Sequence, residues 1–348
     1  MAITIHPLSE ETFPAVKEML PGLWGRNWSP EFVDRLFRWR FLERQGGESI
    51  LAMDGDQCVA MIDSWVRDYM IDGDLVRVRE LCDWFSLPEY GGAGLKPMRM
   101  MMKKPEPIVS IGGSQATQSL LPRLGWKALS HPAVDYSLLL TGAPLVDRFF
   151  NRFNLPGKKA CVRLASSISL PHRSPGTHIA PAKELAFIEH TRNSPVPNVN
   201  PPRGSYQLAS LIGSNEIDWI CSAPKEMGEF IALEFLVEDQ VIGLTLSRLF
   251  SGEHTIKANI VQVQSSQVST ESYRWMINET ASVMASRGAD VVKCRTSCAL
   301  MADALHQLGY LKRGSWQTVW WSKSQEPPIG PILLSRYRAD DAIQPYPK

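Results

Sequence analysis

Several short patterns in the first half of this chain recur in the second half at an almost constant offset. The recurring pairs are Asp56–Val59 with Asp239–Ile242, Leu124–Trp126 with Leu308–Tyr310, and Trp39 with Trp219. Their offsets are 183, 184 and 180 positions in a chain of 348 residues. Unrelated patterns rarely share an offset by chance, so the sequence predicts one structural unit that is present twice.

In the first half, strands and helices alternate, and the middle strands are joined by tight turns. Asp54-Gly55 and Asp72-Gly73 each stand between β-rich runs, which is the strongest short hairpin signal. The middle of the sheet is therefore expected to be antiparallel. The expected elements are strands at 3–8, 48–54, 57–68, 75–87, 107–111, 126–130 and 133–140, and helices at 10–24, 29–43, 94–103 and 114–124.

Turn-rich segments separate the two units. An amphipathic stretch at Leu145–Phe153 is followed by turn signals at Asn154–Gly157 and Ser174–Gly176, and Ala160–Leu170 is a candidate edge strand between them. We expect a first unit at 1–140, a linker at 141–176, a second unit at 177–324 and an irregular tail at 325–348. The fold class expected is α/β of the α+β type, with two units that each hold a mixed, mostly antiparallel sheet flanked by helices.

A glycine-rich junction follows the strand at 75–87. The residues Pro88–Gly94 read Pro-Glu-Tyr-Gly-Gly-Ala-Gly and lead into a methionine-rich run at Leu95–Lys103. Glycines leave room for backbone N–H groups at a helix start to approach an anion, so this junction is a candidate phosphate cradle. A second strand and helix follow, and the helix is expected to stop at Gly125, just before Trp126.

The stretch from Arg77 to Trp126 resembles the GCN5-related N-acetyltransferase (GNAT) superfamily. That family carries a pyrophosphate loop, Gln/Arg-x-x-Gly-x-Gly/Ala, often preceded by Pro-Glu-Tyr, and its last helix commonly ends in a Gly-aromatic pair. Pro88–Tyr90 matches the tripeptide, Gly94 takes the place of the first glycine, and Gly125-Trp126 matches the pair. Gly91 stands where Gln or Arg is usual, and Lys96 stands where a small residue is usual.

The resemblance implies an N-acyltransferase that moves an acetyl or other acyl group from acyl-CoA to a primary amine of a small molecule or sugar. The implied cofactor is acetyl-CoA or another acyl-CoA, held largely by backbone N–H groups of the loop, with the preceding strand beside the pantetheine arm. The residues expected to bind it are Phe85, Ser86, Leu87, Gly91, Gly92, Ala93, Gly94, Leu95, Lys96 and Ser114.

Glu80 is the candidate base that removes the amine proton. It lies 14 positions ahead of Gly94, the spacing at which histone-type members of the family carry their glutamate base. If side chains alternate along the strand, Glu80 shares a face with Val78, Cys82 and Trp84, and this apolar wall would raise its pKa.

Two other interpretations of this strand stay open. Glu80 could instead pair with Arg77 or Arg79 on a half-exposed strand, as many structural glutamates do. Asp83 is a second candidate base, expected on the opposite face from Glu80.

Family members often use a tyrosine of the last helix to protonate the departing thiolate. Counting back from Gly125-Trp126, that position holds Leu121, and its counterpart in the second unit holds Leu305. Water or another donor would then be needed, and Tyr136 is the candidate. The absence of this acid also favours an alternative, a non-catalytic protein that binds acyl-CoA or serves as a scaffold.

The second unit lacks the loop glycines. After the strand expected at Thr255–Gln264, the segment Ser265–Glu271 has the composition of a capped helix start and contains no glycine. Ser and Thr at such a start more often cap the helix than bind phosphate. We therefore expect a degenerate second unit that shapes the acceptor pocket or stabilises the first.

Two further enzyme classes compete with this interpretation. Gly112–Ala116 resembles the nucleophile elbow of serine hydrolases, with Ser114 as nucleophile, but the elbow belongs to a doubly wound parallel sheet. Under the GNAT interpretation Ser114 caps the last helix. A FemABX-type aminoacyl transferase also uses paired GNAT-like units, but its usual helical arm is not evident in the sequence.

Composition limits the partners and the compartment. There are 37 basic and 36 acidic residues, so no overall field favours nucleic acid or an anionic membrane, and neither is an expected partner, although a local patch stays open. The six scattered cysteines favour reduced core thiols, and Cys294 and Cys298 have no histidines at ligand spacing, so no metal is expected. Without a signal peptide or a long apolar run, a cytoplasmic protein is expected. The oligomeric state is not predicted.

Overall fold

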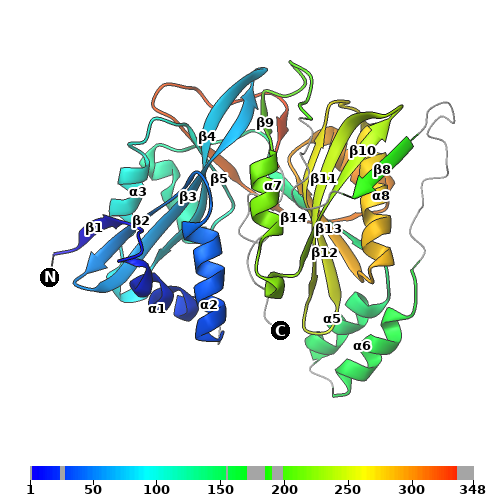
Figure 1. Ribbon diagram of the computed structural model, residues 1–348, viewed down its shortest axis with the longest axis horizontal. Coiled ribbons are helices and arrows are strands. Elements are labelled where there is room, and N and C mark those ends of the chain that lie inside the picture. The colour runs from blue at the N-terminus through cyan, green and yellow to red at the C-terminus, as the bar shows by residue number, and fades with distance from the viewer. Residues whose placement is uncertain (1, 24–27, 154–155, 171–184, 190–198, 335–348) are drawn as a thin grey trace.

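The computed structural model of the chain shows two β-sheets side by side, each covered by helices (Figure 1). Placement is described for all residues except 1, 24–27, 154–155, 171–184, 190–198 and 335–348. None of the helices in the described part combines the length and the apolar character that spanning a bilayer requires.

The first sheet is built mainly from the first half of the chain. Its hydrogen-bonded strand order is β1 (Thr4–Pro7), β2 (Gly47–Asp54), β3 (Gln57–Ile71), β4 (Asp74–Ser86), β5 (Ile108–Ile111), β15 (Thr318–Trp321) and β6 (Lys127–Ala128). Its helices are α1 (Phe13–Leu23), α2 (Pro30–Phe37), the π-helical turn η1 (Arg38–Leu42), α3 (Leu95–Met101) and α4 (Gln115–Leu120). Turns at Gly55 and Gly73 join β2, β3 and β4 as antiparallel hairpins, as the Asp-Gly pairs predict.

The second sheet repeats this plan. Its strand order is β14 (Leu311–Trp316), β7 (Ala133–Leu139), β13 (Val291–Thr296), β12 (Ile256–Ser265), β11 (Gln240–Ser251), β10 (Glu229–Val237) and β8 (Leu185–Glu189). Helices α7 (Ser214–Cys221), α8 (Thr270–Ser286) and α9 (Ala299–Gln307) pack with it. Both sheets are mixed and mostly antiparallel, which confirms the predicted fold class.

The two sheets exchange a strand. Strand β7 belongs to the first half of the chain, but it lies between β13 and β14 in the second sheet. In return β15, near the end of the described chain, lies between β5 and β6 in the first sheet. The predicted strand at 133–140 is therefore present, but it completes the sheet of the other unit. The domain boundaries stay a prediction. The predicted first unit, 1–140, contains β7 of the second sheet, and the predicted second unit, 177–324, contains β15 of the first sheet.

The repeat that the sequence shows extends to irregularities of the backbone. The pairing of β2 with β3 shifts register between Ala52 and Met53, and that of β10 with β11 shifts between Phe235 and Leu236, 183 positions later. A second shift, opposite β4, falls between Asp63 and Ser64, and its counterpart falls after Leu246, again 183 positions on. β-bulges at matching positions show that the two units share detailed backbone geometry.

The expected linker contains a helical hairpin. Helices α5 (Ala143–Phe153) and α6 (Lys158–Ser166) pack on each other through a small cluster that includes Ala143, Val162 and Ala165. The candidate edge strand at 160–170 is therefore wrong up to Ser166, where the chain is helical, and at its end Ser169 forms an isolated antiparallel bridge with Thr141. Cys161 on α6 is exposed, unlike the core thiols predicted from the sequence.

The tail that was predicted to be irregular takes part in strand pairing. Strand β16 (Ile332–Leu333) pairs with β9 (Leu208–Ser210), so the tail predicted to be irregular from 325 contains a short strand. Residues 335–348 of that tail lie outside the described residues, and so does the turn signal at Ser174–Gly176. An apolar cluster joins α1, α2 and β3 to α7, β10 and β11, so the two units share one core.

Candidate functional site

A cleft opens between β4 and β5. These parallel strands pair only at Arg79 with Ile108 and at Glu80 with Val109, and beyond Glu80 they separate. The resulting cavity, here called the β4–β5 cleft, has a volume of about 500 Å³. It is lined on one side by Leu81–Ser86 and on the other by residues around the start of α4, among them Ser114. In the described chain, β4 and β5 form no ladder pairing beyond Glu80, so a ligand in the cleft would lie along this edge of β4.

A bulge at Cys82 shapes this cleft. Leu81 lies opposite Ser64 and Asp83 lies opposite Asp63, which leaves Cys82 as the extra residue. The extra residue breaks the alternation of side chains, so residues beyond it change face. A bulge of this kind cannot be read from hydrophobic alternation, because it depends on pairing with another strand.

The bulge corrects two sequence expectations. Trp84, expected on the face of Glu80, packs instead with the cluster of Met98 and Met101, and its indole N–H donates to the Gly94 carbonyl at 3.0 Å. Asp83 was expected on the face opposite Glu80. It points toward η1 and accepts hydrogen bonds from the buried Arg40 of that helix. The apolar wall predicted for Glu80 therefore does not include Trp84.

The glycine junction forms a tight turn that leads into α3. The amides of Ala93, Leu95 and Lys96 donate to carbonyls within the turn, whereas no such bond is found among the described residues for the amides of Gly91, Gly92 and Gly94. A Cβ at Gly94 would lie 2.7 Å from the Trp84 indole nitrogen, so this glycine is needed for close packing. Gly91 and Gly92 are exposed, and a Cβ at either position would meet no atom within 4 Å.

The predicted cofactor residues fall into two groups. Phe85, Ser86 and Ser114 line the β4–β5 cleft. Leu87 lines a separate cavity between α1 and β3, and the turn from Gly91 to Lys96 is not part of the cleft lining. The structure thus brings the strand residues and Ser114 together and leaves the glycine turn beside them.

Ser114 is the N-cap of α4. Its backbone is extended, with φ −63° and ψ 163°, and its hydroxyl accepts a hydrogen bond from the Thr117 amide at 3.2 Å. A nucleophile elbow would hold its serine in a strained turn within a parallel doubly wound sheet, and neither feature is present here. The expectation that Ser114 caps this helix is confirmed. Leu121, which the resemblance places where other members carry the tyrosine acid, lines the same cleft.

Glu80 stands at the apex of the cleft and is buried. Its carboxylate accepts hydrogen bonds from Arg67 at 3.0 Å and from the Tyr69 hydroxyl at 2.7 Å. Burial raises the pKa of Glu80 to about 7, although Arg67 acts in the opposite direction. The alternative pairing is wrong, because Arg77 bonds to Asp68 and Arg79 bonds to Glu48 and Glu106.

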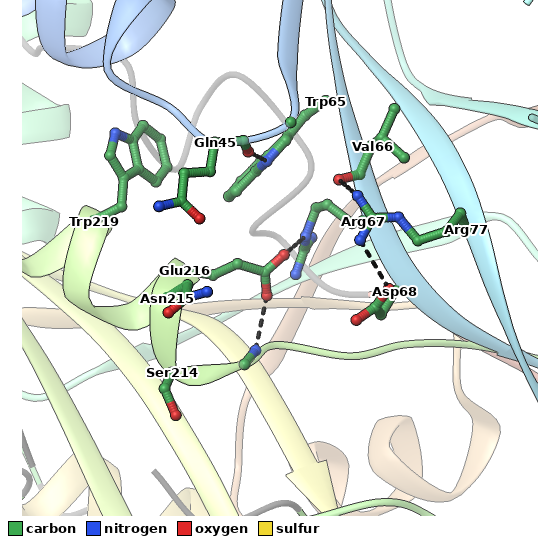
Figure 2. Close-up of a pocket in the computed structure, with 12 residues that line it drawn as sticks. Gln45, Trp65, Val66, Arg67, Asp68, Arg77, Ser214, Asn215, Glu216 and Trp219 are labelled. Atoms are coloured by element: carbon green, nitrogen blue, oxygen red, sulfur yellow. Dashed lines mark hydrogen bonds and ion pairs between the residues drawn. The ribbon is translucent and has the colours of Figure 1, made fainter. Parts of the chain in front are cut away.

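Arg67 connects Glu80 to a cavity between the two units (Figure 2). This interunit cavity has a volume of about 580 Å³, and Trp65 and Trp219 line it from opposite units. Arg67 of β3 donates to Glu80 and also to Glu216 of α7 at 2.8 Å, and Figure 2 shows the latter contact. Glu80 itself lines neither cavity, but its neighbour Leu81 lines the β4–β5 cleft and its partner Arg67 lines the interunit cavity.

Two further buried ion pairs extend this row of charges. Arg40 binds Asp83 at 2.6 Å and Arg44 binds Asp63 at 2.6 Å, with all four side chains fully buried. Asp83 also lines the β4–β5 cleft, and its Oδ1 atom has no hydrogen-bond partner within the described part of the protein. An unpaired buried carboxylate oxygen beside a cavity is a candidate contact for a donor group of a ligand. The sequence gives no sign of these pairs, because they join residues up to 43 positions apart.

Tyr136 lies elsewhere. It is on β7 in the second sheet, where it lines a third cavity of about 450 Å³ between α5 and the sheet. Burial raises its pKa. The structure therefore does not bring the two predicted catalytic residues, Glu80 and Tyr136, into one cavity.

The equivalent region of the second unit is occupied by the chain itself. The Tyr206 hydroxyl lies 2.5 Å from that of Tyr273 in the first turn of α8, and 3.4 Å from the Cys298 sulfur just after β13. The amide of Leu334, beyond β16, donates to the Ser297 hydroxyl. Ser269 caps α8, as its position in the sequence predicts.

No family model and no curated protein matches this sequence. Solved structures do resemble it over most of its length. N-myristoyltransferase from Saccharomyces cerevisiae, solved with myristoyl-CoA and inhibitors, is 11% identical with a TM-score of 0.58, over 94% of this chain and 82% of that one. A GCN5-related N-acetyltransferase from Anabaena variabilis is 10% identical with a TM-score of 0.53, over 92% and 72%.

A third structure is a conserved protein from Enterococcus faecalis described as a probable N-acyltransferase. It is 9% identical with a TM-score of 0.51, over 91% of this chain and 72% of that one. Identities this low establish the fold alone. They confirm that the chain has a GNAT-like α/β fold, as the resemblance in the sequence predicts.

Proposed function

We propose that this protein is an acyl-CoA-dependent N-acyltransferase that transfers an acetyl or other acyl group to a primary amine of a small molecule or sugar. The observation that carries the proposal is the separation of β4 and β5 directly after Glu80. It creates a cleft with an unpaired strand edge, in a fold that N-acyltransferases of known structure also have.

The residues around the cleft fit a thioester cofactor. The edge of β4 at Leu81–Ser86, where β5 has separated from it, would run beside an amide-bearing pantetheine arm, and Ser86 and Ser114 add hydroxyls. Gly91 and Gly92 are exposed, their amides have no backbone hydrogen-bond partner in the described chain, and these amides would hold the pyrophosphate. When bound, the thioester supplies an activated acyl carbon and a thiolate leaving group.

Glu80 would take the proton that the amine loses. The amine nitrogen bonds to the acyl carbon, the carbon–sulfur bond breaks, and the sulfur leaves with its electron pair. A carboxylate with a pKa of about 7 is half ionised near neutral pH, which suits a general base. Arg67 and Tyr69 hold this carboxylate in place at the apex of the cleft.

The acceptor is proposed to enter from the interunit cavity, which reaches Glu80 through Arg67. In this arrangement the second unit contributes Glu216 and Trp219 to acceptor binding and binds no cofactor of its own. The tyrosines that occupy its corresponding region support that division of roles. Tyr136 is not part of the proposed site, because it lines another cavity.

One alternative function has an observation in its favour. Leu121 replaces the acid of the family at the cleft wall, and Glu80 already has two hydrogen-bond partners. Both features suit a protein that binds acyl-CoA without turnover. Nothing in the site favours a serine hydrolase or a FemABX-type transferase.

Calorimetric titration with acetyl-CoA and with a long-chain acyl-CoA tests the proposal. Gly91→Asp places a carboxylate at the proposed pyrophosphate position, at an exposed site with an unstrained backbone, and Gly91→Ala is its matched control. We expect the aspartate variant to bind at least about tenfold more weakly through charge repulsion, and the alanine variant to bind like wild type. No binding to wild type at millimolar ligand would remove the proposal. Thiol release with a panel of amines then separates the enzyme from the binding protein.

A further inference from the structure

The cavity that Tyr136 lines is strongly basic. It lies between α5 and the second sheet, and both Leu145 and Arg148 of α5 contribute to it. Its cationic side chains come from one helix and three strands: Arg148, Lys257, Lys293 and Arg313. We call it the basic pocket. The hydroxyls of Tyr136, Ser137 and Thr255 also line it.

The two acidic residues of the basic pocket are already neutralised. Asp135 accepts two hydrogen bonds from Arg295, the shorter at 2.8 Å, and Asp147 forms an ion pair with Lys158 at 3.1 Å. Neither Arg295 nor Lys158 belongs to the lining. Four cationic side chains thus line the pocket against two carboxylates that each bind a cation outside the lining, and arginine and lysine donors match the oxygens of a phosphate group.

An apolar stripe runs along α5 from the mouth of this pocket. Leu145, Phe149 and Phe153 follow one another at intervals of four residues and are 52%, 53% and 55% exposed. This spacing places them on one face of the helix. The rings of Phe149 and Phe153 are 4.9 Å apart. Because Leu145 belongs to both features, the stripe and the pocket form one continuous surface.

Within the part of the chain that the structure describes, these side chains of the hairpin stay exposed. In Figure 1, α5 and α6 lie at one end of the second sheet, on the side away from the first sheet. Their shared core is small, so it does not bury the phenylalanines. Helix α6 adds Leu164, which is 72% exposed, and just beyond it lies Ile168, which is 56% exposed. Exposed apolar side chains on one face of a helix, such as the stripe on α5, mark an interaction surface.

Charge along the hairpin is also one-sided. Between 143 and 168 the only acidic residue is Asp147, and the basic residues are Arg148, Arg152, Lys158, Lys159 and Arg163. The formal charge of the whole chain, +1, hides this local excess. Helices that combine exposed Phe and Leu with flanking Arg and Lys are typical of elements that lie in the headgroup layer of a membrane.

We propose that the α5–α6 hairpin and the basic pocket bind the surface of an anionic phospholipid bilayer. The stripe of Leu145, Phe149 and Phe153 enters the boundary between headgroups and acyl chains, while the basic pocket receives a lipid phosphate. A phospholipid carries a phosphate and acyl chains in one molecule, which matches a basic pocket that continues into an apolar stripe. This surface acts independently of acyl transfer.

Vesicle sedimentation of the full chain tests this proposal. The probes are vesicles of phosphatidylcholine alone and vesicles that also contain phosphatidylglycerol. We expect binding to the second kind, weakened by salt, and at least about tenfold weaker binding for Phe149→Ser/Phe153→Ser, because two exposed rings no longer enter the bilayer. Arg148→Gln should weaken binding about fivefold through lost attraction to the lipid phosphates. Leu75→Ser is the matched control, since Leu75 is 66% exposed but lies on the hairpin between β3 and β4, away from the proposed surface. This variant should bind the vesicles like wild type.

Other outcomes would overturn the proposal. These are absence of binding to the phosphatidylglycerol vesicles, equal binding to phosphatidylcholine, and unchanged binding by both stripe and Arg148 variants. Saturable binding of inorganic phosphate without vesicle binding would assign the pocket to a soluble anion. Concentration-dependent dimers that the phenylalanine variant abolishes, without vesicle binding, would assign the stripe to a second copy. Circular dichroism melts show whether each variant is folded. If the double phenylalanine variant is unfolded, Arg148→Gln, which changes an exposed residue, provides the test instead.

Discussion

Trp39 and Trp219 stack face to face at the junction of the two units, with ring centroids 4.5 Å apart and ring planes within 9° of parallel. Each indole N–H donates to the backbone carbonyl of the other residue, in both cases at 2.9 Å. One residue lies in η1 and the other in α7, 180 positions apart. The contact is therefore reciprocal, as expected where two copies of one unit meet about a local twofold axis.

The first prediction concerns this pair. Trp39→Ala and Trp219→Ala should each lower the free energy of unfolding by about 3–5 kcal/mol, because each removes a buried ring and leaves a cavity in the shared core. Urea unfolding followed by fluorescence measures the effect. Since the contact is reciprocal, the two costs should agree within about 1 kcal/mol.

Phenylalanine at either position is the control. It keeps an aromatic ring but loses one indole N–H, so the expected cost falls to about 1–2 kcal/mol. A large loss for one tryptophan and none for the other would contradict the reciprocal contact.

The second prediction compares a buried ion pair with an exposed one. Asp83→Asn removes the carboxylate that the buried Arg40 guanidinium binds at 2.6 Å and should lower the free energy of unfolding by about 3–5 kcal/mol. Asp68→Asn is the matched change, because the Arg77–Asp68 pair is about half exposed, and it should cost less than about 1 kcal/mol. Denaturant melts of both variants at neutral pH give the comparison. Equal costs would show that the Arg40–Asp83 pair is not buried in solution.

The third prediction follows from the exchanged strands. Residues 1–140 alone lack β15, so β5 and β6 lose the strand that lies between them, and β7 has no sheet to join. We expect this fragment to lack a cooperative unfolding transition. Fragments 1–170 and 171–348, expressed together, should associate, because they supply all strands of both sheets. A fragment 1–140 that unfolds cooperatively as a monomer would show that the exchanged strands are not needed for folding.

The local elements could be predicted because their signals are local. Asp-Gly turns, capping serines and a glycine stop each depend on a few neighbouring residues, and β3, β4 and α4 lie close to the expected ranges. The exchange of β7 and β15 could not be predicted in this way. It depends on which edge a strand finds after folding, and either sheet could accept a strand of the same composition.

The candidate site shows the same division. Phe85, Ser86 and Ser114 could be placed at the cleft because they flank a strand–helix pattern that the sequence displays. The partner of Glu80 could not, because Arg67 lies on the neighbouring strand and the closer Arg77 and Arg79 bind other groups. The orientation of Asp83 depends on the bulge at Cys82, which arises from pairing with β3.

The fourth prediction concerns stability and pH. Burial raises the pKa of Glu80 from 4.5 to about 7, so the folded protein holds this proton more tightly than the unfolded chain does. The resulting stabilisation is fully present below pH 4.5 and is lost as the pH rises through 7, a change of roughly 3 kcal/mol. Glu80→Gln has no such proton, so the unfolding free energy of the variant relative to wild type should rise over this range. Urea melts from pH 4.5 to 8 measure it, and a constant difference would contradict the raised pKa.

The fifth prediction separates an enzyme from a binding protein. If Glu80 is the base, the kcat/KM for thiol release should rise with pH up to about 7 and then level off, because only the ionised carboxylate accepts a proton. Glu80→Gln should lower kcat/KM by about 10²–10⁴-fold and remove this inflection while leaving acyl-CoA affinity unchanged. Glu106→Gln is the control, since Glu106, like Glu80, pairs with an arginine, in its case Arg79 of β4, but does not line the cleft. A Glu80→Gln variant that keeps the rate and the pH profile would exclude Glu80 as the base. Acyl-CoA binding without thiol release for any amine would instead establish a non-catalytic role.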